Sequence, residues 1–553
     1  MKIFNKSSTD ITTDIWDKYQ KGVDWHNKNS IYTDTEQYYN FFQGDQWNGI
    51  DTGGEQLPMH NFITPTVEYK VAMIAMSLVS INYSSQNRGE KHKIFQDACD
   101  KLNQSAAIWW EQQKMDTKRW NILRQKCVSG DAYLYFYNAN ADSQIIDRTN
   151  IYLSDEQNND IQKQKYIIIY ERRFVDDIKE EAKTNGIPDD EIEMIVGDDD
   201  TDTLPENVRG NEVSGTKKCS CLLYMTKKNG NVVFARSTKT VVYQPETEVE
   251  GLTMYPIVNS LWNEKRGSSR GIGVVQMMLN NQIETNKLLA RRSINIKMTG
   301  FPKPVINTQM FSNPTDVDKV GATMKMNGSI SSIKDAFGYV APSYVSNDAK
   351  VMQDELIENS RDFANAGDNA TGNINPTRTS AAAITAVRDQ QSLASTQAQA
   401  TDKQFIEDIA IVLLNIWTAY NPNGLTVDVM GTDGITQEVI PAEILTELSA
   451  QARIDISPVN PYSKLTQIQF IDNLIANQTL FENTQMLQEY HDMLPEDGSI
   501  PKDKLQEIID RRNTTMQDQK TSQLDQATSM IDQQQQMIQQ LQGGGNNEMS
   551  TVQ

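Results

Sequence analysis

The sequence predicts an α+β protein that is mainly helical, and three observations indicate this fold class. Several long segments lack Pro and Gly and carry apolar residues at helical spacing. Short apolar runs bounded by turn residues lie between these segments, as expected of strands. The longest helical segment, Ser380–Tyr420, has 41 residues without Pro or Gly, or roughly 60 Å of helix. A helix of that length is uncommon in a monomeric globular domain, so it favours an elongated or multi-subunit protein.

The two halves of Ser380–Tyr420 differ in character. The first half consists mainly of Ala, Gln, Ser and Thr, so we expect it to approach neighbouring helices closely or to face water. Asn421–Gly424 ends the helix. The second half carries an apolar stripe at spacings of three and four, made of Phe405, Ile409, Val412, Leu413 and Ile416. We therefore expect the apolar end to lie in a domain and the Ala/Gln end to face other subunits or a lumen.

The N-terminal half is predicted to mix helices with short strands. A short helix from Glu36 ends at Gly44, a second spans Asn61–Met76 with Thr64 as its N-cap, and one long helix runs from about Glu90 to Cys127. The strands follow the break at Gly130. They are Tyr133–Tyr137, further strands within 144–174 including Tyr166–Tyr170, a hairpin within 217–245 that turns at Asn229-Gly230, and Tyr255–Val258.

The second half begins with a predicted pair of helices, Val274–Met298 and Asp348–Ala364. The insert 299–346 between them is bounded by Pro and has short strands predicted near 304–306, 323–326 and 329–333, so we expect an antiparallel pair with a small domain at its tip. Arg291, Arg292 and Lys297 crowd the end of the first helix. They either complement the helix dipole in solvent or face DNA or a protein partner.

The last part of the chain is predicted to return to strands before further helices. The strands are Leu425–Met430, Thr436–Ile440 and Arg453–Ile456, with a turn or short helix at 441–450. Amphipathic helices follow at Ser463–Glu489 and Lys502–Arg512. A Gln-rich tail from Thr514 has apolar residues spaced three and four apart, which fits either a coiled coil or a disordered segment.

The composition limits the classes of function. The net charge is −21, which argues against a protein that grips DNA through a basic surface and permits one that lets DNA slide past. The segment Asp176–Glu206 holds thirteen acidic residues, which we expect to form a solvated edge. Four cysteines and four histidines show no metal-ligand or disulfide pattern, and no phosphate-binding loop motif occurs. We therefore expect reduced thiols, no metal, no cofactor and no enzymatic activity.

The first ten residues lack the apolar run of a secretory signal, and no stretch of 18 apolar residues occurs, so no membrane partner is expected.

Five motifs in a fixed order resemble those of the portal proteins, or head-to-tail connectors, of tailed bacteriophages. The order of the helices, the insert, the loop and the long helix also resembles that family, over nearly the whole chain. The motifs are Phe42–Trp47, Asn61–Val67, Ser129–Ala132, Gly271–Gln282 with Asn286, and Asn375–Ala383.

The resemblance implies a portal-type fold with an α/β wing, a two-helix stem, a small β-containing clip, a long kinked helix and a helical crown. It places the wing at 1–271 and 425–460, stem helices at 272–298 and 347–365, the clip at 299–346, the tunnel loop at 366–379, the long kinked helix at 380–424, the crown at 461–513 and the tail at 514–553.

The resemblance also implies the function and the partners. Such proteins form a homo-oligomeric ring, usually of twelve subunits, at the portal vertex of the virion after assembly in the host bacterial cytoplasm. Double-stranded DNA passes through the ring during packaging and ejection. The terminase large subunit, the head–tail adaptor, and the major capsid and scaffolding proteins are the expected partners. The alternative interpretation is a non-enzymatic coiled-coil scaffold or adaptor that binds no nucleic acid.

Candidate functional residues follow from these assignments. The tunnel loop would line the channel with few basic contacts, which allows DNA to slide because each contact is weak. The clip would bind the motor and the adaptor. The candidates are Asp368, Asn369, Asn373, Asn375 and Arg378 in the loop, Arg291, Arg292 and Lys297 in the stem, and Lys303, Asp316, Lys319 and Lys325 in the clip.

Overall fold

The computed structural model describes residues 8–52, 54, 56–75, 79–85, 92–198, 217–300, 303–313, 315, 323, 325–327, 337–340, 347–364, 381–431, 434–456, 511, 531 and 533–537. The chain divides into two compact units, Met1–Ala75 with Ile81–Asp455, and Met76–Ser80 with Ile456–Gln553. Nearly all described elements belong to the first unit. The predicted helices at 463–489 and 502–512 and most of the tail lie outside the described residues.

The described elements confirm an α+β fold. The longer helices are α1 (Ser8–Lys28), α2 (Ile31–Gln43), α3 (Ile63–Ala75), α4 (His92–Gln112), α5 (Met115–Ser129), α6 (Val175–Thr184), α9 (Val274–Gly300), α10 (Asp348–Phe363), α12 (Ala381–Tyr420) and α13 (Ala442–Gln451), with the shorter α7 (Asp189–Glu193) and η1 (Ile161–Lys163).

The described strands form six small sheets, and the paired strands other than β1 and β16 run antiparallel. Their bounds are β1 (Ile81–Ser85), β2 (Asp131–Tyr137), β3 (Asp142–Ile146), β4 (Ile151–Leu153), β5 (Tyr166–Phe174), β6 (Lys218–Lys228), β7 (Asn231–Ser237), β8 (Val242–Glu248), β9 (Ile257–Leu261), β10 (Asn263–Glu264), β11 (Gly271–Ile272), β12 (Lys303–Ile306), β13 (Phe337–Val340), β14 (Leu425–Gly431), β15 (Gly434–Ile440) and β16 (Ala452–Ile456).

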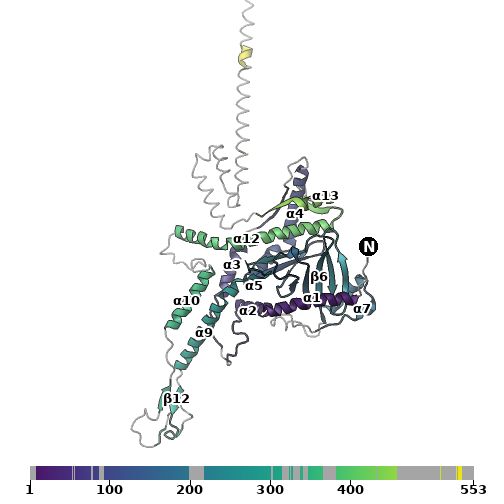
Figure 1. The fold of residues 1–553 in the computed structure, drawn as a ribbon. Helices are drawn as coiled ribbons and strands as arrows, with labels where there is room; N and C mark the ends of the chain where they lie inside the picture. The colour runs from purple at the N-terminus through teal and green to yellow at the C-terminus, as the bar shows by residue number, and fades with distance from the viewer. Residues whose placement is uncertain are drawn as a thin grey trace, which may run out of the picture. The chain divides into compact units, whose positions relative to one another are not determined.

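A five-stranded sheet in the order β4-β5-β6-β7-β8 carries helices on both faces (Figure 1). Side chains alternate along β6, so Leu222 and Tyr224 pack against α1 while Cys219 and Cys221 pack against α6 and α7. All four cysteines are buried and free. The predicted hairpin turn at Asn229-Gly230 is confirmed between β6 and β7.

One prediction for the N-terminal half was wrong, and one helix was missed. The helix predicted from Glu90 to Cys127 is two helices, because the chain turns at Lys114, which adopts a left-handed conformation with φ 51°. Helix α1 was not predicted; its apolar residues Ile15, Tyr19 and Val23 are buried against the sheet at the helical spacing of four.

The acidic edge is confirmed in part. Most acidic residues between Asp176 and Glu193 are exposed, but Glu181 pairs with Arg173 (2.6 Å) and Asp198 with Arg172 (2.8 Å).

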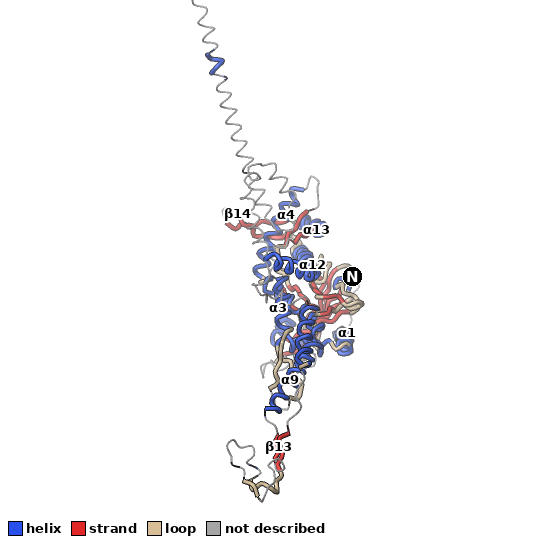
Figure 2. The backbone as a smooth tube through the Cα atoms, turned by 90° about the vertical axis from the view of Figure 1, so that its left-hand side faces the viewer, coloured by secondary structure: helices blue, strands red, loops and turns tan. Residues whose placement is uncertain are grey.

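A second core joins α2, α3, α5 and α9 and includes Phe62, Val67, Leu123 and Val275. Helix α9 leaves this core and packs antiparallel to α10, and the β12–β13 hairpin lies beyond the end of the pair in both views (Figures 1 and 2). The predicted helix pair and its small β-containing insert are thus confirmed in outline. Strand β13 was not predicted, 323–326 contributes only a single bridge between Met326 and Phe311, and the predicted strand at 329–333 lies outside the described residues.

Helix α12 runs without interruption from Ala381 to Tyr420, as predicted. Its predicted apolar stripe is buried, from Phe405 to Trp417. It contacts β9, α3 and α13. The predicted strands after it are β14, β15 and β16, and the segment at 441–450 is the helix α13.

Candidate functional site

Segments far apart in the sequence meet at the base of α9 around two buried amide side chains, Gln282 and Asn286. Gln282 Nε2 donates to the His60 carbonyl (2.7 Å), and its Oε1 accepts from the Phe62 backbone N–H (3.2 Å). Asn286 Nδ2 donates to Gln46 Oε1 (2.5 Å), and its Oδ1 accepts from the His60 N–H (3.3 Å). Because buried amides are costly unless both ends are bonded, this network fixes the α2–α3 connection against α9.

The turn into α3 belongs to the same junction. Asn61 Oδ1 accepts from the backbone N–H groups of Ile63 and Thr64 (3.1 and 3.2 Å), so Asn61 is the capping residue and the predicted role of Thr64 was wrong. The Thr64 hydroxyl instead donates to the Phe42 carbonyl. Gly44 ends α2 with φ 91°. The motifs Phe42–Trp47, Asn61–Val67 and Gly271–Gln282 with Asn286 therefore converge in one place.

The fourth motif joins them through direct backbone contact. Gly130 ends α5 with φ 106°, and a Cβ on it would lie 2.3 Å from the Gly271 carbonyl oxygen. A Cβ on Gly271 would lie 2.1 Å from the Gly130 oxygen, and one on Gly273 would lie 2.4 Å from the Val128 oxygen. Since no larger residue fits at these distances, the glycines set how α5 meets the start of α9.

A buried charge cluster lies beside this contact and was not predicted. Arg270 binds Glu156 through Nη2 (2.8 Å) and Nε (3.0 Å), and its Nη1 lies 3.4 Å from Asp131 Oδ2. Arg148 Nη2 lies 3.1 Å from Asp131 Oδ1. His26 Nε2 lies 3.0 Å from Arg270 Nη2 and 3.8 Å from Glu156 Oε1. Two arginines and two carboxylates balance, so the cluster is neutral when His26 is neutral.

The surroundings determine the protonation of this cluster. Burial, together with the positive charges of Arg270 and Arg148, lowers the pKa of His26 to about 4, although Glu156 opposes this shift. Burial alone would raise the pKa of Glu156, but Arg270, His26 and Ser269 outweigh it and hold that pKa well below its usual range. At neutral pH His26 is therefore uncharged and accepts a hydrogen bond from Arg270.

We expect this cluster to destabilise the protein as the pH falls from about 6.5 to about 4. In that pH window His26 binds a proton in the unfolded state but not in the folded state. The free energy of unfolding therefore falls by up to roughly 3 kcal/mol. Urea unfolding at several pH values would measure this slope. His26→Gln should reduce the slope, and His60→Gln, at an exposed position, should retain it. An unchanged slope in His26→Gln would contradict the assignment.

Helix α12 is fixed to the core by a second buried cluster. Arg119 binds Asp402 through Nη2 (2.7 Å) and Nε (3.1 Å), and Nη2 also donates to the Ile74 carbonyl (3.1 Å). Lys126 is fully buried and donates to Ser260 Oγ (2.9 Å). Burial, with Arg119 nearby, lowers the pKa of Lys126 to about 8, while Asp402 opposes the shift.

The three predicted basic residues of the stem have different surroundings. Arg292 Nη1 donates to Gln353 Oε1 on α10 (2.8 Å), so it joins the two helices, a role that the sequence did not predict. Nearer the base, Asn281 Nδ2 donates to Ser360 Oγ (2.9 Å). Arg291 and Lys297 are exposed, and their roles stay predictions.

The predicted loop and clip residues are described only in part. Asp368, Asn369, Asn373, Asn375 and Arg378 lie outside the described residues, as do Asp316 and Lys319. Lys303 begins β12 opposite Val340 of β13, and Lys325 is exposed, with its backbone N–H donating to Asn313 Oδ1 (3.0 Å).

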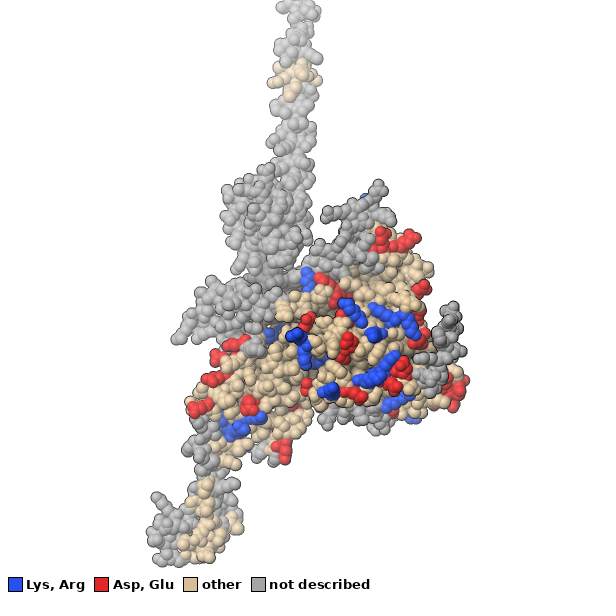
Figure 3. Space-filling view, viewed as in Figure 1, with Lys and Arg blue, Asp and Glu red and all other residues tan. Residues whose placement is uncertain are grey.

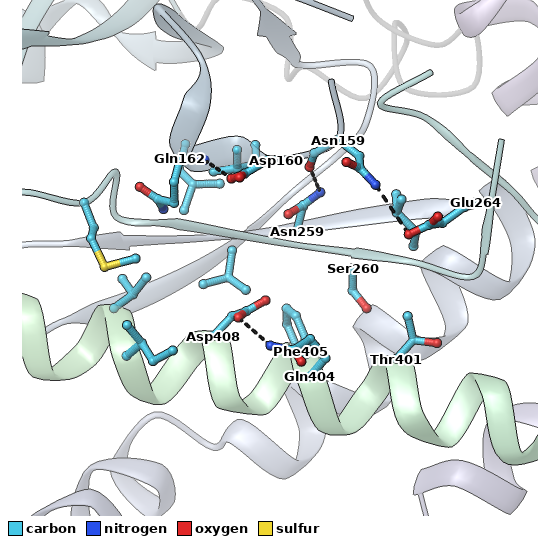
Figure 4. A pocket seen from close by; sticks show the side chains of 17 residues that line it. Asn159, Asp160, Gln162, Asn259, Ser260, Glu264, Thr401, Gln404, Phe405 and Asp408 are labelled. Atoms are coloured by element: carbon cyan, nitrogen blue, oxygen red, sulfur yellow. Dashed lines mark hydrogen bonds between the residues drawn. The ribbon is translucent and has the colours of Figure 1, made fainter. Parts of the chain in front are cut away.

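A cavity of about 380 Å³ lies between α12 and the segments 159–162 and 254–264 (Figure 4). Asp160, Glu264 and Asp408 line it together with amides and an apolar floor that includes Phe405 and Val412. Gln404 Nε2 donates to Asp408 Oδ1 (3.0 Å). Burial raises the pKa of Asp408, and the carboxylates of Glu407 and Asp160 add to this effect. The cavity therefore combines an apolar floor with three carboxylates, which suits a basic side chain with an apolar stem.

Among the residues that the structure describes, no cluster of His, Cys, Asp and Glu is arranged to hold a metal ion. No helix in the described part of the chain combines the length and apolarity needed to cross a bilayer. Comparisons with protein-family models and with curated protein sequences found no match to this chain.

Proposed function

We propose that this chain is the portal subunit of a tailed bacteriophage. Copies of it form a ring, usually of twelve, at one vertex of the capsid, and double-stranded DNA passes through the ring during packaging and ejection. The five motifs and their order support this proposal, because four of them converge where the helix pair leaves the body. The role is structural rather than enzymatic. The insert 299–346 is the proposed docking surface for the terminase large subunit and the head–tail adaptor, and the capsid and scaffolding proteins are the remaining partners.

The observation that carries the proposal is the exposure of large apolar side chains along α9 and α10. Ile294, Ile296 and Met298 are 40%, 68% and 48% exposed, and Val351 and Met352 are 47% and 49% exposed. Soluble monomers rarely gather such residues on two adjacent helices without a partner. Since the helices are otherwise rich in charged and amide residues, these five positions favour contact with other chains.

The directions of these side chains favour two different neighbours. Residues two apart on a helix point about 200° apart, so Ile294 and Ile296 point to different sides of α9. Val351 and Met352 are separated by about 100° around α10. A two-fold dimer would need one apolar patch, whereas a ring needs two unlike patches on each subunit. The distribution therefore fits a closed ring better than a dimer.

We expect Ile296→Glu combined with Val351→Glu to weaken ring assembly at least tenfold, because each charge would be buried against a neighbour. Light scattering of the full chain over a concentration series measures the mass. Ile94→Glu, at a 55% exposed position on α4, is the matched control and should leave the mass unchanged. Normal ring mass in the double variant would contradict the stem assignment, and a wild-type mass of one chain would contradict the ring.

The net charge fits a conduit that does not hold DNA. Every phosphate bound by a basic wall would have to be released at each step of translocation, while carboxylates and amides offer weak contacts. The net charge of −21 agrees with a channel wall of carboxylates and amides. The loop 366–379 as the channel lining, with Arg378 as its basic contact, is part of this proposal.

A further inference from the structure

A second cavity, of about 280 Å³, lies where α9 leaves the body. Its walls are the end of α1, the start of α2, the segment 156–157, the loop 265–271 and Gln276 of α9. Arg148 and Arg270 form part of its wall, and both are paired in the neutral buried cluster. The deep part of the cavity is thus already compensated, and any recognition of a partner falls to its mouth.

The mouth of this cavity carries excess positive charge. Lys265 and Arg266 line it, both are exposed, and neither forms a salt bridge among the described residues. Asp34 also lines the cavity, and Lys265 and Arg148 favour its ionised form, although burial raises its pKa overall. Two cations therefore face one carboxylate at the mouth, on a chain whose net charge is −21.

Helix α10 carries the complementary surface. Four carboxylates, from Asp354, Glu355, Glu358 and Asp362, are exposed and form no salt bridge within the described part of the chain. They fall within about 100° of arc on the side away from Gln353 and Ser360, which face α9. Figure 3 shows acidic side chains along the edge of the molecule where α10 lies. We call these four residues the acidic face of α10.

The base end of the acidic face, at Asp362, lies near the level of the cavity along the helix pair. The bond from Asn281 to Ser360 sets the two residues side by side, so Asp362 is level with about residue 279 of α9. Gln276, which lines the cavity, is then within about one helical turn, or about 5 Å, of that level. In a ring whose axis follows the helix pair, a neighbour presents the base end of its acidic face, with Glu358 and Asp362, nearest the height of this cavity.

We propose that the acidic face of α10 in one copy binds Lys265 and Arg266 at the cavity mouth of the next copy. This inference rests on the proposed ring. It adds a polar contact at the base of the stem to the apolar contacts near the tip. Charge complementarity supports a second copy as the partner, and the two surfaces lie on different elements, as a head-to-tail contact requires.

A charge exchange tests this contact. Lys265→Glu with Arg266→Glu, and separately Glu358→Lys with Asp362→Lys, should each weaken assembly at least tenfold in the full chain, because like charges then face each other. Combining all four changes should restore assembly to within about threefold of wild type. Lys179→Glu with Lys183→Glu on α6 makes the same change in charge as the Lys265→Glu, Arg266→Glu variant and serves as its control. Mass photometry of rings and single chains gives the readout, with circular dichroism confirming folding.

The outcomes separate this inference from the ring itself. The contact would be overturned, and the ring would stand, if both charge-reversal variants assembled as well as wild type. The same conclusion would follow if the combined variant stayed dissociated although each variant is folded. A wild-type chain that remains single at all concentrations would overturn both. Raised salt should weaken wild-type assembly, since the contact is exposed to solvent.

Discussion

Replacing Asp402 by alanine is expected to lower the free energy of unfolding by about 3–5 kcal/mol, because it removes one partner of a buried ion pair. Asp402 is 5% exposed in its side chain, as is Arg119, and the two are joined at 2.7 Å. Lys126, fully buried nearby, is favoured in its charged form by the same carboxylate. The variant would remove the carboxylate that faces Arg119 and favours the charged form of Lys126.

Asp408→Ala is the matched control for this prediction. Asp408 lies on the same helix, is only partly buried, and accepts a hydrogen bond from Gln404 of that helix. Its removal should change the free energy of unfolding by less than about 1 kcal/mol. Urea unfolding followed by circular dichroism compares the two variants. Equal effects would show that the Arg119–Asp402 pair does not secure α12 to the core.

Replacing Gly130 by alanine should have a second large effect. The left-handed backbone at φ 106° costs about 1 kcal/mol for a residue with a Cβ. The Cβ would also overlap the Gly271 carbonyl, which is backbone and moves only with the start of α9, so a further 1–3 kcal/mol is expected. The change would also disturb the orientation of the helix pair and so the assembly.

Gly186→Ala separates the two contributions. Gly186 also has a positive φ, of 75°, but no atom lies within 4 Å of a Cβ built on it. It should show only the conformational cost of about 1 kcal/mol. Thermal unfolding of both variants tests this difference. A Gly130→Ala protein as stable as Gly186→Ala would mean that the backbone contact between α5 and α9 relaxes without cost.

The sequence predicted those parts of the fold that local patterns determine. Apolar spacing predicted α9, α10 and the buried half of α12, and the Asn229-Gly230 pair predicted its hairpin. Helix α1 was missed because its apolar residues are separated by many polar ones. The break at Lys114 was missed because neither Pro nor Gly marks it, although the structure requires φ 51° there.

The candidate site was less accessible to prediction because its contacts join distant positions. Arg119 and Asp402 are 283 residues apart, and His60 and Asn286 are 226 apart. Single residues such as Gln282 and Asn286 were found only through the family resemblance, which gave no reason for their presence. The structure supplies that reason, since both amides satisfy buried backbone groups of the α2–α3 connection.

The central claim is that copies of this chain form a closed ring around an axial channel. Negative-stain or cryo-electron microscopy of the purified full chain tests it most directly. We expect end-on views of rings with one axial hole, side views with a narrow stem formed by α9 and α10, and a single dominant subunit number. Particles of one or two chains at micromolar concentration, or filaments and bundles without a hole, would contradict it.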